Sequence, residues 1–209
     1  MSEEIVFYHN PQSRAQMAHW MLEEAGAPYK TVMIDFAKGE NRTPQFLAIN
    51  PMGKLPTIVH RGTVVTETAA IIAYLADTFP QAGLAPGSGE PARGAYYRWL
   101  FFVAGCCEPA MGNKANGWNP DTPELKVRFG YGSYEQTIDT VAKAVDGKRY
   151  IAADRFTAAD LYMASFLHWG MMFGVIEKRP VFEAYVKPHV ERPAAKRAEA
   201  QAAKLVAKT

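Results

Sequence analysis

Hydroxyl side chains stand at two predicted helix starts, where they are placed to hold an anion. Ser13 ends a segment of turn and N-cap residues, 10–13, that precedes an apolar helical pattern. Thr68, directly after Glu67, opens a second such pattern. The N–H groups and the dipole of a helix N-terminus favour negative charge, so each hydroxyl is a candidate for binding an anionic group. The common alternative at both positions is a plain N-cap.

The sequence shows no pattern of another familiar catalytic or metal chemistry. Its five histidines, at positions 9, 19, 60, 168 and 189, lack metal-ligand spacing and a neighbouring carboxylate cluster. No nucleophile-elbow, dinucleotide-binding or P-loop glycine pattern occurs. The two cysteines, Cys106 and Cys107, are adjacent, an arrangement that rarely bridges and suits a reducing compartment. We therefore expect no metal ion and no tightly bound cofactor.

The 209-residue chain has an ordinary composition for a soluble protein, 48% hydrophobic and 21% charged. That length accommodates one large domain or two smaller ones. The net charge of +2 is too small to indicate a nucleic-acid or membrane partner. The N-terminus has no basic and apolar signal pattern, and no apolar run reaches membrane-spanning length, so a cytoplasmic protein is expected.

The first 80 residues alternate between strand and helix patterns. In order, they predict a strand at 4–9, a helix at 14–25, a strand at 32–36, a short helix at 44–49, a hairpin of 57–60 and 63–66, and a helix that is capped by Thr68 and ends before Pro80. The closely spaced strand, helix and strand at the beginning form a βαβ unit, whose two strands run parallel. This order predicts a thioredoxin-like α/β domain, a mixed four-stranded sheet with helices on its faces.

Residues 81–90, rich in glycine and proline, predict a linker, and 91–209 is predicted to be an all-helical bundle domain. An aromatic-rich helix is expected from 91 to about 113, with a bend near Gly105 and Pro109.

Two further helices are expected in this second domain. One opens at 122–124 and carries an apolar seam that steps by threes and fours from Val127 to Val145. The other is apolar on all sides and opens with Thr157 and Asp160, the spacing of a capping box. Asp160 is therefore expected to be structural rather than catalytic.

Five segments of the chain resemble, in order and spacing, those of the cytosolic glutathione S-transferases. They are FYHNPQSRAQM, NPMGKLPTIV, TETAAIIAYLADTFP, FTAADLYMASFL and ERPAAKRAEA. The resemblance implies that residues 1–80 bind glutathione as a co-substrate and that 91–209 hold the pocket for a second substrate. It also implies a homodimeric, detoxifying enzyme that transfers alkyl or aryl groups to the glutathione sulfur.

The resemblance assigns glutathione contacts to two motifs. Leu55 is expected to precede a cis proline, Pro56, and to offer its backbone N–H and C=O to the cysteinyl part of glutathione. The Thr68 hydroxyl and N–H are expected to hold the γ-glutamyl carboxylate, while Glu67 pairs with the ammonium group.

The glycyl carboxylate of glutathione needs a cation or an amide beside it. Four side chains are candidates: Lys38, Arg42, Gln45 and Lys54. The motif favours Lys54 among them.

The start of the first helix decides how a thiol would be used. Thioredoxin-like redox proteins carry Cys-x-x-Cys there. Residues 10–13 contain no cysteine, which excludes dithiol exchange. This segment also differs from that of the transferase classes that have a cysteine at the helix start. The resemblance implies instead that a side chain stabilises the thiolate of bound glutathione, whose unperturbed pKa is near ~8.5. Ser13 is the first candidate, Tyr8 at the end of the first strand is the second, and Asn10 also has a donor.

The second substrate is expected to be a small apolar electrophile. Helical spacing places Trp99, Phe102 and Cys106 on one face, with Met111 further along the chain and His9 beside the thiol. Two other functions stay open: glutathione-dependent isomerisation or dehalogenation, and a non-catalytic protein-interaction module. The retained glutathione motifs argue against the module, and the sequence does not define the electrophile.

Overall fold

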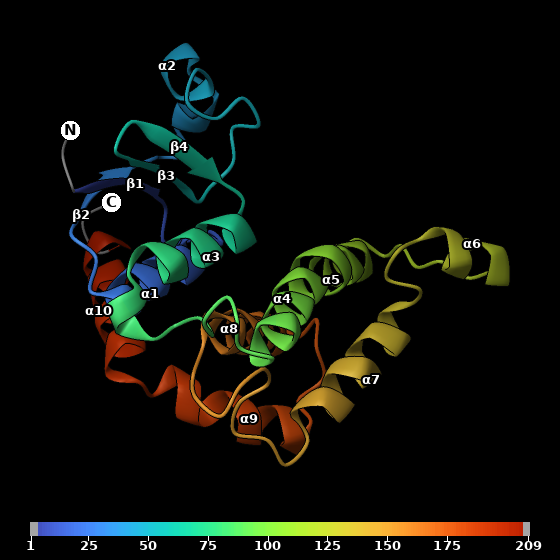
Figure 1. The fold of residues 1–209 in the computed structure, drawn as a ribbon. Coiled ribbons are helices and arrows are strands. Elements are labelled where there is room, and N and C mark those ends of the chain that lie inside the picture. The colour runs from blue at the N-terminus through green and yellow to red at the C-terminus, as the bar shows by residue number, and fades with distance from the viewer. Residues whose placement is uncertain (1–3, 207–209) are drawn as a thin grey trace. The chain divides into compact units, whose positions relative to one another are not determined.

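The computed structural model describes residues 4–206, which divide into two compact units (Figure 1). The first unit contains residues 4–84 together with 192–206, and the second runs from Ala85 to Glu191. The prediction that the helical domain extends over the whole of 91–209 is therefore wrong at its C-terminal end. The last helix returns to the first unit because its side chains pack against and pair with the first helix.

The first unit is built on a mixed four-stranded sheet. Its strands are β1 (Ile5–His9), β2 (Tyr29–Met33), β3 (Thr57–His60) and β4 (Thr63–Thr66), in the order β2-β1-β3-β4. β1 and β2 are parallel, and the other two pairings are antiparallel. Arg61 and Gly62 both have positive φ, as a tight two-residue hairpin requires. The predicted thioredoxin-like arrangement is confirmed.

Strand β2 lies three residues earlier than predicted. Its register pairs Tyr29 with Ile5 and Met33 with His9, so β1 offers no further partner residue beyond this point. The alternation at 32–36 that suggested the strand belongs mostly to the chain leaving the sheet, and Phe36 is exposed.

Helices cover both faces of this sheet. They are α1 (Ala15–Ala25), the 3-10 turn Glu40–Arg42, α2 (Pro44–Leu47), α3 (Thr68–Thr78), the 3-10 turn Pro80–Ala82 and α10 (Pro193–Val206). α1 packs against both α3 and α10. These three helices lie on one side of the sheet and α2 lies on the other (Figure 1). Among residues 4–206, no helix is long and apolar enough to cross a membrane.

The second unit is helical, as predicted. Its helices are α4 (Ala92–Phe102), α5 (Glu108–Ala115), α6 (Pro123–Arg128), α7 (Tyr134–Val145), α8 (Ala158–Met172) and α9 (Pro180–Val190). A π-helical segment, Val103–Cys107, joins α4 to α5. It contains Gly105 and ends just before Pro109, whose missing N–H removes one regular helical hydrogen bond. The irregularity stands where the bend was expected.

The continuous seam predicted from Val127 to Val145 is wrong in its first part. The chain leaves the helical conformation after Arg128, and Val127 is 86% exposed. Gly132 has a positive φ of 70°, and Ser133 starts α7 by accepting a hydrogen bond from the Gln136 N–H. Two helices with separate caps replace one, because the glycine turn interrupts the apolar spacing.

Candidate functional site

Three chain segments meet at one end of the sheet in the first unit. Tyr8 of β1 pairs with Thr57 of β3, which pairs in turn with Thr66 of β4. Neighbouring strands lie about 4.8 Å apart, so the segments that continue from these three residues share one edge. They are 9–13 after β1, 54–56 before β3, and 67–68 after β4. The sequence-predicted motifs are thus brought together by strand register.

The segment after β1 is fixed by Asn10. Its side-chain N–H donates to the Ile34 C=O over 2.8 Å, and its side-chain oxygen accepts from the Gln12 N–H, also over 2.8 Å. Asn10 therefore joins the β1 exit to the β2 exit. These two hydrogen bonds fix the loop and leave only part of the Asn10 side-chain amide available to a ligand.

Ser13 lies just before α1 and is half-buried. Its hydroxyl donates to the Asn10 C=O over 2.7 Å and accepts from the Ala15 N–H over 3.1 Å. The next two N–H groups bond within the turn as well, Gln16 to the Ser13 C=O and Met17 to the Arg14 C=O. Since these backbone donors are occupied, the hydroxyl hydrogen is the donor at this helix start that can turn toward a ligand.

Tyr8 and His9 point to opposite faces of the sheet, as successive strand residues must. The Tyr8 ring meets Phe46 of α2 edge-on, with centroids 5.5 Å apart. His9 faces α1, where its ring lies 5.1 Å from that of His19. Burial, together with the nearby His19, lowers the pKa of His9 to about 3.

The prediction that His9 lines a substrate pocket is wrong. Its side chain is 0% exposed, because the residue belongs to the buried face of β1 and packs inside the first unit.

The Leu55–Pro56 peptide is cis, as predicted. The preceding loop is held by Asn50, a residue that sequence reasoning missed. Its side-chain N–H groups donate to the Lys54 C=O over 2.9 Å and to the Thr57 hydroxyl over 3.0 Å. Its only sequence signal is its place at the head of the NPMGKLP motif.

The segment after β4 starts α3 in an unusual way. Thr68 was predicted to cap the helix, and this is wrong: Glu67 is the N-cap residue and Thr68 is the first helical residue. The Glu67 side chain makes no capping hydrogen bond at the start of α3. Glu67 is exposed and has a φ of +66°, a conformation that is costly for a residue with a side chain. A helix start beside an exposed carboxylate suits a ligand with both a negative and a positive group.

The four candidates for the glycyl carboxylate differ in how they are held. Lys38 pairs with Asp35 over 3.1 Å, and hydrogen bonding to that carboxylate raises the pKa of Lys38. The Arg42 guanidinium donates to the Met52 C=O over 3.3 Å. Gln45 and Lys54 are both exposed, the latter immediately before Leu55.

The remaining predicted pocket residues all lie in the second unit. Trp99 is only 6% exposed and packs edge-on against Phe102, so the structure places it in the core of that unit. Cys106 is half-buried, its thiol donates to the Gly130 C=O over 3.6 Å, and burial raises the pKa of the thiol. Phe102 and Met111 are half-buried. Phe102, Cys106 and Met111 therefore keep accessible side-chain surface, whereas Trp99 is buried.

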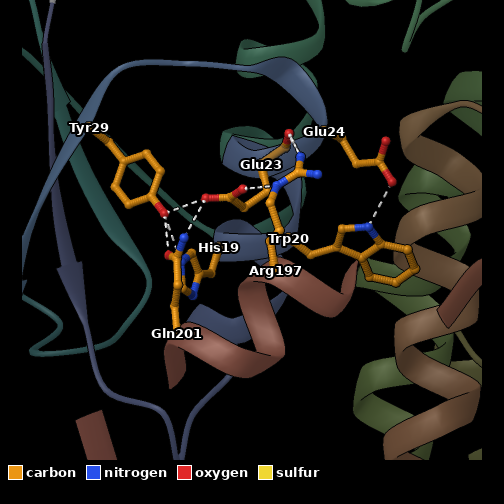
Figure 2. Close-up of polar contacts among 7 residues, drawn as sticks. All are labelled: His19, Trp20, Glu23, Glu24, Tyr29, Arg197 and Gln201. Carbon is orange, nitrogen blue, oxygen red and sulfur yellow. Dashed lines mark hydrogen bonds and ion pairs between the residues drawn. The ribbon is translucent and has the colours of Figure 1, made fainter. Parts of the chain in front are cut away.

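A polar cluster in the first unit, of which His19 is buried and Arg197 exposed, was also missed by sequence reasoning. It joins α1, the start of β2 and α10 (Figure 2), and consists of His19, Glu23, Tyr29, Arg197 and Gln201. Its members are separated by up to 182 residues along the chain. Only the basic character of the C-terminal segment could have hinted at it.

Comparisons with known proteins give a consistent result. The family described as "Glutathione S-transferase, N-terminal domain" matches residues 3–77. The chain is 27% identical over 189 residues to glutathione S-transferase GstA of Escherichia coli O157:H7, covering 89% of this chain and 92% of that protein. It is 41% identical over 147 residues to glutathione S-transferase 1 of Dianthus caryophyllus, covering 68% and 66%. A crystal structure of a glutathione transferase from Methylococcus capsulatus superposes with a TM-score of 0.79, at 28% identity and with 95% and 98% covered.

Proposed function

The chain belongs to the glutathione S-transferase family, and we propose that it binds glutathione at the shared edge of 9–13, 54–56 and 67–68 and stabilises its thiolate for attack on a small apolar electrophile. The observation that carries this proposal is the register Tyr8–Thr57–Thr66, which gathers the three motifs at one edge. A detoxifying role in the cytoplasm is part of the same proposal.

The γ-glutamyl group is proposed to bind at the start of α3. Its carboxylate meets the first N–H groups of the helix and the Thr68 hydroxyl, and its ammonium pairs with Glu67. The cysteinyl backbone pairs with Leu55, whose backbone precedes β3 like the start of an added strand. For the glycyl carboxylate, Lys54 remains the first choice, because Lys38 already pairs with Asp35 and Arg42 with a backbone carbonyl.

Thiolate stabilisation is proposed to come from the Ser13 hydroxyl. This hydrogen is directed at the Asn10 C=O, so it must turn toward the sulfur when glutathione binds. The exchange is favourable because a hydrogen bond to a charged acceptor is stronger than one to a neutral carbonyl. Tyr8 is the weaker candidate because its ring packs on Phe46, and Asn10 is weaker because it braces the loop.

One experiment tests the function and separates its alternatives. Calorimetric titration with glutathione is expected to show binding, and incubation of glutathione with an aryl halide is expected to give the conjugate. Binding without turnover of any electrophile would indicate an interaction module instead. Turnover that regenerates free glutathione would indicate an isomerase. No binding at millimolar glutathione would contradict the proposal outright.

We also propose that the protein is a homodimer. Tyr97 and Phe101 of α4 are 39% and 63% exposed and stack with centroids 6.1 Å apart, and such paired aromatic rings favour burial in an interface. Sedimentation at micromolar concentration is expected to give about twice the chain mass of 23.1 kDa. A mass equal to one chain would contradict the dimer.

A further inference from the structure

The C-terminal helix α10 contacts α1 through a largely half-buried polar cluster (Figure 2). The Glu23 carboxylate accepts from the Tyr29 hydroxyl over 2.7 Å, from the Gln201 amide over 3.1 Å and from the Arg197 guanidinium over 2.7 Å. Three buried alanines, Ala194, Ala198 and Ala202, lie along α10 and permit close approach of the two helices.

Within this cluster, His19 lies between Gln201 of α10 and His9 of β1. Its Nε2 lies 2.8 Å from the Gln201 side-chain oxygen and 2.9 Å from the Tyr29 hydroxyl. Because the amide oxygen of Gln201 can only accept, the His19 Nε2–H donates to it, and the Tyr29 hydroxyl lies 2.7 Å from the same oxygen. Burial lowers the pKa of His19, which favours the neutral ring that this assignment requires.

On its other side, the His19 ring touches the strand that leads into the site. Its centroid lies 5.1 Å from that of His9 and 5.8 Å from that of Phe7. Neither ring nitrogen of His9 has a hydrogen-bond partner within residues 4–206. The orientation of the buried His9 ring is therefore determined by packing, and the Phe7 and His19 rings are among its neighbours.

His9 is in turn one residue from the loop that carries the candidate donor. Asn10 follows it directly, and the Asn10 C=O accepts the Ser13 hydroxyl over 2.7 Å. A continuous chain of contacts thus runs from Gln201 through His19 and His9 to Asn10 and Ser13. It joins the last helix of the chain to the first loop.

We propose that Gln201 and His19 are positioning residues of the thiolate site, and that they set the place of the Ser13 hydroxyl by fixing the His9 ring at the start of the 10–13 loop. This inference rests on the proposed function for its catalytic consequence. Its structural part, the positioning of the loop, stands on the contacts alone. A shift of the hydroxyl by a fraction of an ångström matters because charge-assisted hydrogen bonds depend steeply on geometry.

The test compares two variants of the full chain that both weaken the hold of α10 on α1. Gln201→Leu removes the His19 contact. Arg192→Leu is the matched control, since Arg192 binds the Glu24 carboxylate of α1 through two hydrogen bonds of 2.6 and 2.8 Å. Both are expected to lower thermal stability. The measurements are the pKa of the bound glutathione thiol, the affinity for glutathione, and amide hydrogen exchange at Gln12 and Ala15.

For Gln201→Leu we expect the bound thiol pKa to rise by about 0.5 unit or more, roughly a threefold loss of thiolate, with unchanged glutathione affinity. Exchange at Gln12 and Ala15 is expected to accelerate, because both amides bond to side chains of the loop. Arg192→Leu is expected to change neither quantity. If Gln201→Leu does not fold, His19→Gln interrupts the same chain and must give the same result.

Equal effects of both variants would overturn the proposal, because α10 would then act only through overall stability. Unchanged thiol pKa and exchange in Gln201→Leu would overturn it as well. Should the wild-type protein bind no glutathione, the proposed function fails by itself. Hydrogen exchange at the loop would still decide whether Gln201 positions it.

Discussion

The starts of α3 and α8 use similar residues for different purposes. Each combines a hydroxyl with a carboxylate, Thr68 with Glu67 in one case and Thr157 with Asp160 in the other. At α8 the carboxylate is 0% exposed and forms a capping box with Thr157. At α3 the carboxylate is exposed, it makes no capping hydrogen bond, and the backbone of Glu67 is strained.

The difference lies in how completely each carboxylate is satisfied. Asp160 accepts from the Ile151 and Thr157 N–H groups, each within 2.8 Å, and from the Thr157 and Tyr185 hydroxyls, both at 2.9 Å. With its acceptor capacity used and no exposed surface, it cannot meet a ligand. At α3, by contrast, the carboxylate makes no capping bond, stays exposed, and belongs to a residue whose conformation stability alone does not favour.

The largest effect is expected from Asp160→Ala. The change leaves two buried N–H groups and the Tyr185 hydroxyl without an acceptor, so we expect a loss of about 3–5 kcal/mol in unfolding free energy. Denaturant unfolding measures this. Tyr185→Phe, which removes a single donor, is the matched control and is expected to lose about 1 kcal/mol. A stable Asp160→Ala protein without activity would show that the carboxylate is catalytic.

Glu67→Ala is expected to affect the ligand rather than the fold. Loss of the charge-assisted contact to the ammonium group is expected to weaken glutathione binding by about 1.5–3 kcal/mol, as measured by calorimetry. Glu67→Gly sharpens the test, because glycine tolerates a φ of +66° and is expected to keep or raise stability while binding weakens equally. Equal affinity in all three proteins would remove Glu67 from the site.

Ser13→Ala is expected to change the ionisation of glutathione more than its affinity. The hydrogen bond favours the charged sulfur, so its loss is expected to raise the pKa of the bound thiol by about 1–2 units, roughly 1.4–2.7 kcal/mol, and to lower kcat. Titration of the thiolate absorbance measures the shift. Tyr8→Phe is the control. A shift that occurs only in Tyr8→Phe would transfer the role to the tyrosine.

Acid is expected to weaken the first unit through His9. Its pKa is lowered to about 3 by burial, so the unfolded chain takes up this proton near pH 6.5 while the folded chain does not. The contribution of neutral, buried His9 to the free energy of unfolding is complete above pH 6.5. It is lost as the pH falls toward 3, by about 1.4 kcal/mol per pH unit, or about 2 kcal/mol at pH 5. His9→Phe, compared by urea unfolding at pH 7 and pH 5, is expected to lose less on acidification. An identical pH dependence would exclude His9 as the cause.

Features with a local signal were predicted well from the sequence. The hairpin that joins 57–60 to 63–66, the start of the short helix at residue 44 and the capping box of Thr157 and Asp160 each depend on residues within a few positions of one another. The cis peptide at Pro56 followed from the family resemblance. The assignment of the site motifs to one ligand also followed from that resemblance, whereas the register that groups them came from the structure.

The errors concern features that depend on distant residues or on one irregular turn. The assignment of α10 to the first unit depends on ion pairs such as that of Glu23 with Arg197, which no local sequence pattern reveals. The break before α7 depends on a single glycine turn inside an otherwise regular apolar spacing. The burial of His9 depends on which face of β1 meets α1, and a short alternating strand does not define this.

Because α10 follows the whole of the second unit in the sequence, it also sets the order of events during synthesis on the ribosome. The sheet, α1 and α3 are translated first, yet the helix that packs on α1 emerges only after residues 85–191 have been made. The second unit is thus the first whose chain is complete, although N-terminal domains generally fold first. Until translation reaches Gln201, the nascent first unit lacks the helix that packs on the acidic end of α1.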